Sequence, residues 1–306
     1  EPGQYPGTHR QPHTVPQTHQ RHSNRNMEQI NDSHRILFVL VLYKCTVEKS
    51  RTFQTLLADF PHHQAHLFIY DNSPYHQETN IPVAEYVHDT ANGGIGKAYN
   101  SACQYAQTHQ YHWLMLLDQD TAFPPNAIAQ YYKAIADNPN IQMIAPRHQI
   151  KTGEFMSPTH YRMKTSHLQS DTLYGIVKFK QAAPINSGIL VSIASFLKVG
   201  GYDEPVWLDF SDIRFIEKYK RHYHSFYVIK DLVCVQNFSS EETDLECIFR
   251  RFLIYLECAA NYPKETVLDT IAMTLTTLRI TLSRTLKEKK IRYLHAYWNI
   301  YIRKSR

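Results

Sequence analysis

The stretch Trp113-Leu-Met-Leu-Leu-Asp118-Gln-Asp120 decides the fold that we expect for this chain. Its first five residues are apolar without alternation, which is typical of a strand covered on both faces. Two carboxylates follow at the carboxyl end of the strand, where ligands bind in open α/β sheets. Carboxylates this close repel each other unless a cation or a shared proton lies between them. One interpretation of Asp118 and Asp120 is therefore a divalent-metal site, and the other is a solvated turn.

The composition is that of an ordinary globular protein. The chain has 306 residues, enough for one large or two modest domains, and 43% of them are hydrophobic. The formal net charge of +5 does not imply nucleic acid, since no recognised binding module accompanies it. No apolar run approaches the roughly 20 residues that a membrane-spanning helix needs. We therefore expect neither a nucleic-acid-binding protein nor an integral membrane protein.

Cysteine usage indicates a reducing compartment. The five cysteines are scattered, their number is odd, and no Cys-x-x-Cys pair occurs. Buried free thiols explain this pattern better than a disulfide framework does. We therefore expect a cytoplasmic location.

Residues 1–26 have the composition of a disordered segment. They are rich in Pro, His, Gln and Thr and have no apolar periodicity, so they cannot bury enough surface to offset the entropy of ordering. We interpret them as a disordered leader or a cloning remnant, with Met27 as the natural start. The next domain is then expected to span residues 27–238.

A strand–helix–strand unit precedes the opening stretch. Ile36–Tyr43 is an apolar strand, and Leu67–Tyr70 is the next one. Between them apolar residues from Phe53 to Phe60 recur at helical spacing, and Pro61 is expected to end that helix. Such a unit implies parallel strands with a right-handed crossover, and hence a nucleotide-binding α/β architecture.

Two further polar segments follow strands. Asp71 and Asn72 come directly after the second strand, where a carboxylate can accept hydrogen bonds from a ribose or base. An Asx-turn is the alternative interpretation of Asp71. The segment Asn92–Asn100 contains three glycines and opens a helix whose N-terminus suits phosphate. It matches neither the Walker nor the Rossmann glycine pattern.

The later part of the chain alternates strands and helices before it becomes helical. A helix near Asn126–Ala136 precedes a strand at Ile141–Ala145, and the polar region Arg147–Phe179 is expected to form a lid or insertion. The segment Asn186–Ser192 is expected to place a small polar turn before another apolar strand, and a further strand is expected at Phe226–Val235. Between them Asp209 and Asp212 lie where a helix to Lys220 begins, and a capping role for an acid there is the alternative to chemistry.

Residues 239–306 are expected to form a C-terminal helical region. Ser239-x-x-Glu242 has the form of a capping box, and Pro263 is expected to start a second helix. The segment Arg279–Arg306 combines Arg and Lys with a stripe of Tyr, Trp and Leu. One interpretation is peripheral contact with the inner face of the cell membrane. The other is packing on the domain core or in a homodimer.

Four of these signals occur in an order that resembles the family 2 glycosyltransferases with the GT-A fold. They are Asp71-Asn-Ser, Asn92-Gly-x-x-Gly-x-Ala-x-Asn100, Asp118-Gln-Asp120 and the segment from Gly200 to Phe215. The resemblance covers about residues 36–240 and is greatest to the rhamnosyltransferase-like branch that builds bacterial surface polysaccharides. It implies a mixed sheet that binds a nucleotide-sugar donor, a dTDP- or UDP-sugar, with Mg²⁺ or Mn²⁺ on the diphosphate. The acceptor would be a saccharide or a lipid-linked saccharide.

The resemblance also implies a role for each candidate residue. Asp120 would bind the metal, with Asp118 supporting it from the sugar side. Asp212 matches the position of the family's catalytic base, and Asp209 is a second carboxylate near it. Asn100 would be structural. The nucleotide pocket would be formed by Asp71, Asn72, Asn92, Gly93, Gly96 and Lys97.

The chain departs from the family pattern in two places. Many relatives carry a histidine after the last strand of the sheet, where this chain has Gln236 and Asn237. The first strand ends in Tyr43-Lys-Cys instead of a small polar turn. Two other function classes stay open: a sugar nucleotidyltransferase, which would need a glycine-rich loop after the first strand, and a non-catalytic protein that binds nucleotide-sugars or glycans.

Overall fold

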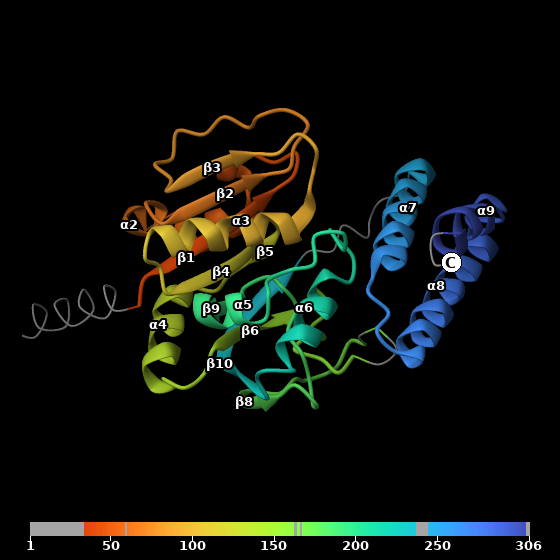
Figure 1. Ribbon diagram of the computed structural model, residues 1–306. Coiled ribbons are helices and arrows are strands. Elements are labelled where there is room, and N and C mark those ends of the chain that lie inside the picture. Colours follow the sequence, from red (N-terminus) through yellow and green to blue (C-terminus); the bar gives the residue numbers. More distant parts are fainter. Residues whose placement is uncertain (1–33, 59, 162–163, 166, 237–243, 304–306) are drawn as a thin grey trace, which may run out of the picture. The chain divides into compact units, whose positions relative to one another are not determined.

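Figure 1 shows a computed structural model of the chain, which describes residues 34–58, 60–161, 164–165, 167–236 and 244–303. The predicted leader over residues 1–26 and the predicted capping box at Ser239–Glu242 lie outside these residues. Residues 35–306 form one compact unit, to which everything below refers.

Strand β4 (Trp113–Asp118) lies inside a mixed sheet, as its apolar run predicts. It pairs in parallel with β1 (Ile36–Leu42), which pairs in parallel with β2 (Leu67–Asp71). The predicted parallel pairing of the first two strands is thereby confirmed. On its other side β4 pairs antiparallel with β9 (Leu190–Ser192), so that the polarity of the sheet changes beside the two carboxylates.

The other strands extend the sheet in the order β3-β2-β1-β4-β9-β6-β10-β5. The long strand β10 (Ser225–Gln236) pairs in parallel with β6 (Met143–Gln149), with a register shift between Val228 and Val233. That shift includes the exposed residues Lys230 and Asp231, which divide the predicted strand into two apolar halves. The short strands are β3 (Glu85–His88), β5 (Thr121–Ala122), β7 (Phe155–Ser157) and β8 (Gly175–Lys178).

Alternate residues of β4 enter two apolar layers on opposite faces of the sheet. Leu114 and Leu116 pack with helices α3 (Gly94–Thr108), α5 (Ile193–Lys198) and α6 (Ser211–Tyr219). Met115 and Leu117 pack with α4 (Ala127–Asp137) and the helical residues Phe53–Leu57. Because helices cover both faces, the strand shows no alternation of polarity.

Two local predictions need correction. The helix expected to end at Pro61 is instead a 3₁₀ turn (Val47–Lys49), a π-helical segment (Phe53–Leu57) and the short helix α2 (Pro61–Gln64). Pro61 begins α2 because proline is favoured in the first helical turn, where its missing N–H has no partner to lose. Helix α5 was not predicted, and Ser192 caps it by accepting from the Ser195 amide over 3.1 Å.

The C-terminal region consists of α7 (Leu245–Asn261), α8 (Val267–Glu288), α9 (Arg292–Ala296) and a π-helical end (Tyr297–Ile302). The prediction that Pro263 starts a helix is wrong, since α8 begins at Val267 with Thr266 as its cap. Tyr293, Tyr297 and Tyr301 are buried in a cluster with α7. The predicted aromatic stripe therefore serves mainly to pack the region's own core.

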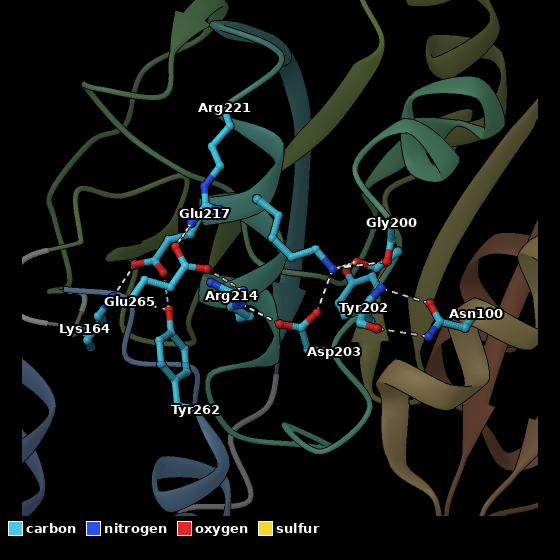
Figure 2. A network of polar contacts seen from close by, with 12 residues as sticks. Asn100, Lys164, Gly200, Tyr202, Asp203, Arg214, Glu217, Arg221, Tyr262 and Glu265 are labelled. Atoms are coloured by element: carbon cyan, nitrogen blue, oxygen red, sulfur yellow. Dashed lines mark hydrogen bonds and ion pairs between the residues drawn. The ribbon is translucent and has the colours of Figure 1, made fainter. Parts of the chain in front are cut away.

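Ion pairs attach this region to the rest of the unit (Figure 2). Arg214 of α6 contacts Asp203 (Nε–Oδ2, 2.5 Å) and also Glu265, just before α8 (Nη2–Oε1, 2.9 Å). The nearly buried Lys164 contacts Glu217 of α6 and Asp269 of α8. Both cations are nearly buried while their acidic partners are partly exposed, and together these contacts join α8 and the residues before it to α6.

Candidate active site

Asp118, at the carboxyl end of β4, is fixed by neighbours from two elements. The hydroxyl of Tyr99 on α3 donates to its Oδ1 over 3.2 Å, and its backbone carbonyl accepts from the Thr52 hydroxyl. The pKa of the Asp118 carboxyl is raised to about 7. Burial is the largest cause, the negative charge of Asp120 is the second, and the charge of Asp212 acts in the same direction. The structure thus brings three of the predicted carboxylates close enough to act on one another.

Asp120 lies two residues further on and contacts the end of β10. Gln236 donates from Nε2 to Asp120 Oδ1 over 3.4 Å. Burial raises the pKa of the Asp120 carboxyl, and the hydrogen bond from Gln236 acts against this rise. The other amide atom, Gln236 Oε1, is buried and has no hydrogen-bond partner among the described residues. An unpaired buried oxygen beside a carboxylate indicates a ligand that this side chain would meet.

These oxygens fit a divalent cation that shares its ligands with a substrate. In the described part of the chain no group of three or more His, Cys, Asp and Glu side chains could hold a metal ion. The protein therefore offers two carboxylates, Asp118 and Asp120, and the amide oxygen of Gln236. Mg²⁺ and Mn²⁺ accept oxygen ligands, and Mg²⁺ is commonly held by one or two carboxylates together with substrate phosphates.

Asp212 lies in the first turn of α6 with its carboxylate held in place. Its Oδ1 accepts from the backbone amide of Ile213 over 2.7 Å, and its Oδ2 accepts from the hydroxyl of Tyr161 over 3.4 Å. Burial is the main cause that raises the pKa of the Asp212 carboxyl, and the charge of Asp209 contributes. A carboxylate with a raised pKa is a stronger base near neutral pH.

Asp209, the second predicted carboxylate on this side, is already paired. Both of its oxygens contact the guanidinium of Arg251 on α7, with a distance of 2.8 Å between Nη2 and Oδ1. A bidentate pair of this kind holds both partners in one geometry. Asp209 thereby ties the segment before α6 to the C-terminal region.

Asp71 and Asn72 differ in how far the protein satisfies them. Asp71 is fully buried and accepts from the backbone amides of Ser73 and Gln77 and from the hydroxyl of Tyr86. The Ser73 contact is the Asx-turn that was the alternative interpretation of this residue. Asn72 is also buried, but its Oδ1 has no partner among the described residues. Of the two, Asn72 is the one with an unused acceptor.

The loop from Asn92 to Lys97 is organised by Asp89. Its Oδ2 accepts from Lys97 Nζ (2.9 Å), Tyr70 Oη (2.8 Å) and the Gly93 amide (3.1 Å). Burial opposes ionisation, but these hydrogen bonds prevail and lower the pKa of Asp89 to about 2. Asn92 adopts the left-handed conformation with φ of 52°. Lys97 is therefore held at the loop by a carboxylate.

The start of α3 contacts the segment that carries Asp209 and Asp212. Gly94 has φ of +83°, and a Cβ there would lie 2.2 Å from the carbonyl oxygen of Trp207. The amide of Ile95 donates to the same carbonyl over 3.0 Å. Only glycine fits at position 94, because both the backbone conformation and the space exclude a side chain. Gly94 thus lets the start of α3 pack closely against the backbone at Trp207.

Asn100 faces the turn at residues 200–204 (Figure 2), and Gly96 approaches the same turn. Asn100 accepts from the Tyr202 amide over 2.9 Å and donates to the Tyr202 carbonyl over 3.0 Å. The predicted structural role of Asn100 is confirmed. A Cβ on Gly96 would lie 3.3 Å from Tyr202 Cβ, so Gly96 lets α3 approach this turn instead of facing an open pocket.

A cavity of about 510 Å³ adjoins Asp212 through Tyr161. Its wall includes Ile213 and Glu217 of α6 and Leu268 and Ile271 of α8. Polar groups come from His160, Lys180 and Lys220. A cavity of this size with several convergent polar groups is suited to a small organic ligand.

Three residues of this site were not singled out from the sequence: Asp89, Tyr99 and Tyr161. Asp89 directly follows strand β3, and Asp71 is the last residue of β2, so this similar position at a strand end could have identified it. Tyr99 lies within the glycine motif, but its direction toward Asp118 depends on how α3 packs. Tyr161 lies in the polar region before β8, and no local pattern connects it with Asp212.

Comparison with known proteins assigns the fold. The sequence profile described as Glycosyl transferase family 2 matches residues 50–196. No curated protein sequence matches the chain. Solved structures do match, in 179 chains, and one is the crystal structure of GalNAc-T7 with UDP, GalNAc and Mn²⁺. That match has a TM-score of 0.51 at 10% identity and covers 79% of this chain and 54% of that chain. The predicted GT-A type of mixed α/β fold is thereby confirmed.

Proposed function

Given the glycosyltransferase family 2 domain over residues 50–196, we propose that this chain is an inverting, metal-dependent glycosyltransferase. It transfers a sugar from a nucleotide-sugar donor, a dTDP- or UDP-sugar, to a hydroxyl of a saccharide or lipid-linked saccharide. Rhamnose is the sugar that the sequence resemblance suggests. The catalytic domain spans residues 27–238, and residues 239–306 form its helical extension.

The convergence of three carboxylates supports this proposal most directly. Tyr99, which donates to Asp118, packs against Tyr202. Tyr202 in turn stacks on Phe215 of the helix that carries Asp212 in its first turn. The charges of Asp120 and Asp212 both act to raise the pKa of Asp118. Two of these acids follow β4, and the third begins α6, nearly a hundred residues later in the chain. A diphosphate-metal site beside a base is what transfer from a nucleotide-sugar requires.

Asp212 acts as the general base. Its carboxylate takes the proton of the acceptor hydroxyl while the acceptor oxygen forms a bond to the anomeric carbon of the donor. The bond from that carbon to the diphosphate oxygen breaks, the diphosphate leaves with the electron pair, and the anomeric configuration inverts. The Ile213 amide and the Tyr161 hydroxyl hold the carboxylate in one orientation, which favours proton transfer.

Asp120, Asp118 and Gln236 Oε1 would hold a Mg²⁺ or Mn²⁺ ion. Such an ion would neutralise the negative charge of the departing diphosphate. Asp118 lies deepest of these groups and faces the donor sugar. Asn72 Oδ1, the unpaired buried acceptor, is suited to a donor group of the nucleoside.

The acceptor binds in the cavity between α6 and α8. Tyr161 and Ile213 line this cavity and are also the two residues that contact the Asp212 carboxylate. Ala272→Trp, on the cavity wall, should fill part of the cavity. It should therefore raise the KM for acceptor and leave donor binding unchanged. An equal loss of donor binding would contradict this assignment.

Asp212→Asn tests the proposal as a whole. Purified full chain is screened with UDP-, GDP- and dTDP-sugars, with and without Mn²⁺, for binding and for transfer. The variant should bind the donor as the parent does and lose transfer by about 10²-fold or more, since general base catalysis contributes on that scale. Asp231→Asn, which changes an exposed acid on β10, is the matched control. Near-normal turnover by Asp212→Asn would remove Asp212 from the role of base.

A further inference from the structure

The polarity of helix α8 is reversed relative to an ordinary surface helix. Its buried residues include Thr276, Thr277 and Thr281, whereas large apolar side chains point outward. An ordinary surface helix turns its apolar stripe to the core and its polar residues to water. Beyond the cavity that Leu268 and Ile271 line, the outward apolar residues are Leu275, Leu282 and Leu286, of which Leu286 is 76% exposed.

Two of the buried threonines, Thr277 and Thr281, are satisfied by the helix itself. Thr277 donates to the carbonyl of Met273 and Thr281 to that of Thr277, each over 2.8 Å. Because these hydroxyls need no other partner, their burial costs little. The reversed polarity is therefore a stable arrangement of the helix.

The rotation of α8 is also fixed from outside. Asp269 in its first turn pairs with Lys164 over 2.9 Å, and Met273 packs in the cluster with α7. Further along, Glu288 accepts from the hydroxyl of Tyr293, which is itself fully buried. These contacts hold the outward leucines away from the protein along the whole helix.

The outward leucines form one stripe. Leu275, Leu282 and Leu286 are spaced seven and four residues apart, and so lie on one side of the helix. The segment that carries them measures about 17 Å, at about 1.5 Å for each residue. An apolar stripe this long on a surface marks a contact with something apolar. No helix in the described ranges is long and apolar enough to cross a membrane.

Basic side chains accompany the stripe. Arg279, four residues after Leu275 and so on its side of the helix, is exposed, as is Lys287 beside Leu286. Lys289 follows directly after the helix and is exposed as well. The acids of α8 are engaged, Asp269 with Lys164 and Glu288 with Tyr293. The surface around the leucines is thus positively charged.

This charge distribution argues against a second copy of the chain as the partner. Arg279 lies near the middle of α8. If two copies paired through this stripe, Arg279 of one copy would face Arg279 of the other. This holds for antiparallel and for parallel helices. Like charges in that position oppose pairing.

We propose that the outward face of α8 is a membrane-contact surface. Its leucines enter the boundary of the acyl chains, and Arg279 and Lys287 meet the headgroups of anionic phospholipids. This places the contact on α8 instead of on the tyrosines near the C-terminus, which are buried. The inference does not depend on the proposed sugar transfer.

Flotation of the full chain with vesicles tests this surface. Vesicles of phosphatidylcholine alone are compared with vesicles that contain an equal amount of phosphatidylglycerol. The parent should float with the anionic vesicles. A triple variant with Leu275→Ser, Leu282→Ser and Leu286→Ser should partition on the order of 100-fold less. Arg279→Gln should reduce partition about fivefold, and only on anionic vesicles.

Ile176→Ser is the matched control, because Ile176 on β8 is 65% exposed but lies outside the stripe. Its partition should equal that of the parent. All variants should keep the thermal unfolding midpoint of the parent, since the changed side chains are exposed. Equal flotation of the triple variant and the parent would overturn the proposal. So would light scattering that shows a dimer of the parent and a monomer of the triple variant, because a second copy would then cover the stripe.

Discussion

The hydroxyl of Tyr161 donates to Oδ2 of Asp212 over 3.4 Å, across 51 positions of sequence. This hydrogen bond favours the ionised carboxylate and so opposes the rise that burial causes in the pKa of Asp212. Tyr161 also lines the cavity beside α6. A single hydroxyl thus links the proposed base to the proposed acceptor site.

Tyr161→Phe should make transfer more sensitive to acid. Without the hydroxyl, the pKa of Asp212 rises further, so a larger fraction of the base is protonated at low pH. The acidic limb of the kcat/KM profile should move to higher pH, with a loss on the order of fivefold at pH 6 and a smaller loss at pH 8. Tyr75→Phe, on a side chain that is 82% exposed, is the control and should leave the profile in place. A uniform loss at every pH would indicate a structural effect alone.

Gln236 should set how strongly the site holds its metal. Gln236→Ala removes the amide oxygen beside Asp120 and should raise the Mn²⁺ concentration for half-maximal donor binding about tenfold or more. Gln236→His supplies an imidazole, a better metal ligand than an amide, and should lower the Mn²⁺ concentration for half-maximal donor binding. Calorimetric titration of donor nucleotide at a series of Mn²⁺ concentrations measures both. If neither variant changes the Mn²⁺ requirement, Gln236 takes no part in metal binding.

His148 should make the fold sensitive to mild acid. It is fully buried on β6, and its Nε2 donates to the carbonyl of Ser187 over 2.7 Å. Burial lowers the pKa of His148 from 6.5 to about 4, and the hydrogen bond to Ser187 acts in the opposite direction. Because the folded-state pKa lies below the unfolded one, the neutral histidine stabilises the fold fully above pH 6.5. This stability of about 3 kcal/mol is lost as the pH falls toward 4.

His148→Gln should remove that part of the pH dependence. Glutamine can donate to the same carbonyl but does not ionise. Urea unfolding at pH 7 and pH 4 measures the difference, which should be about 3 kcal/mol larger for the parent. His222→Gln, on an exposed histidine, should behave as the parent does. Identical pH dependence of all three proteins would show that ionisation of His148 does not contribute to the loss of stability in acid.

The strands and the acids at their ends could be predicted from the sequence. The run of apolar residues before Asp118 is produced by burial on both faces, so the sequence records the environment directly. The same holds for the parallel pairing of β1 and β2, which follows from the spacing of strand, helix and strand. These predictions depend on local pattern alone.

Side-chain partners could not be predicted, because they depend on tertiary packing. Asp209 and Asp212 look alike in the sequence, yet one is paired with Arg251 and the other accepts from Tyr161. The C-terminal region shows the same limit. Its tyrosines and the leucines of α8 have similar periodicity, and only the rotation fixed by contacts such as Lys164 with Asp269 decides which are buried.

The contact between Gly94 and the Trp207 carbonyl has a consequence for ligand binding. Gly94 begins the helix that borders the donor site, and Trp207 precedes Asp209 and Asp212 by a few residues. With the Ile95 amide bonded to that carbonyl, a displacement of one segment is transmitted mechanically to the other. A ligand bound at the proposed donor site would therefore also act on the backbone that carries Asp212, the proposed base.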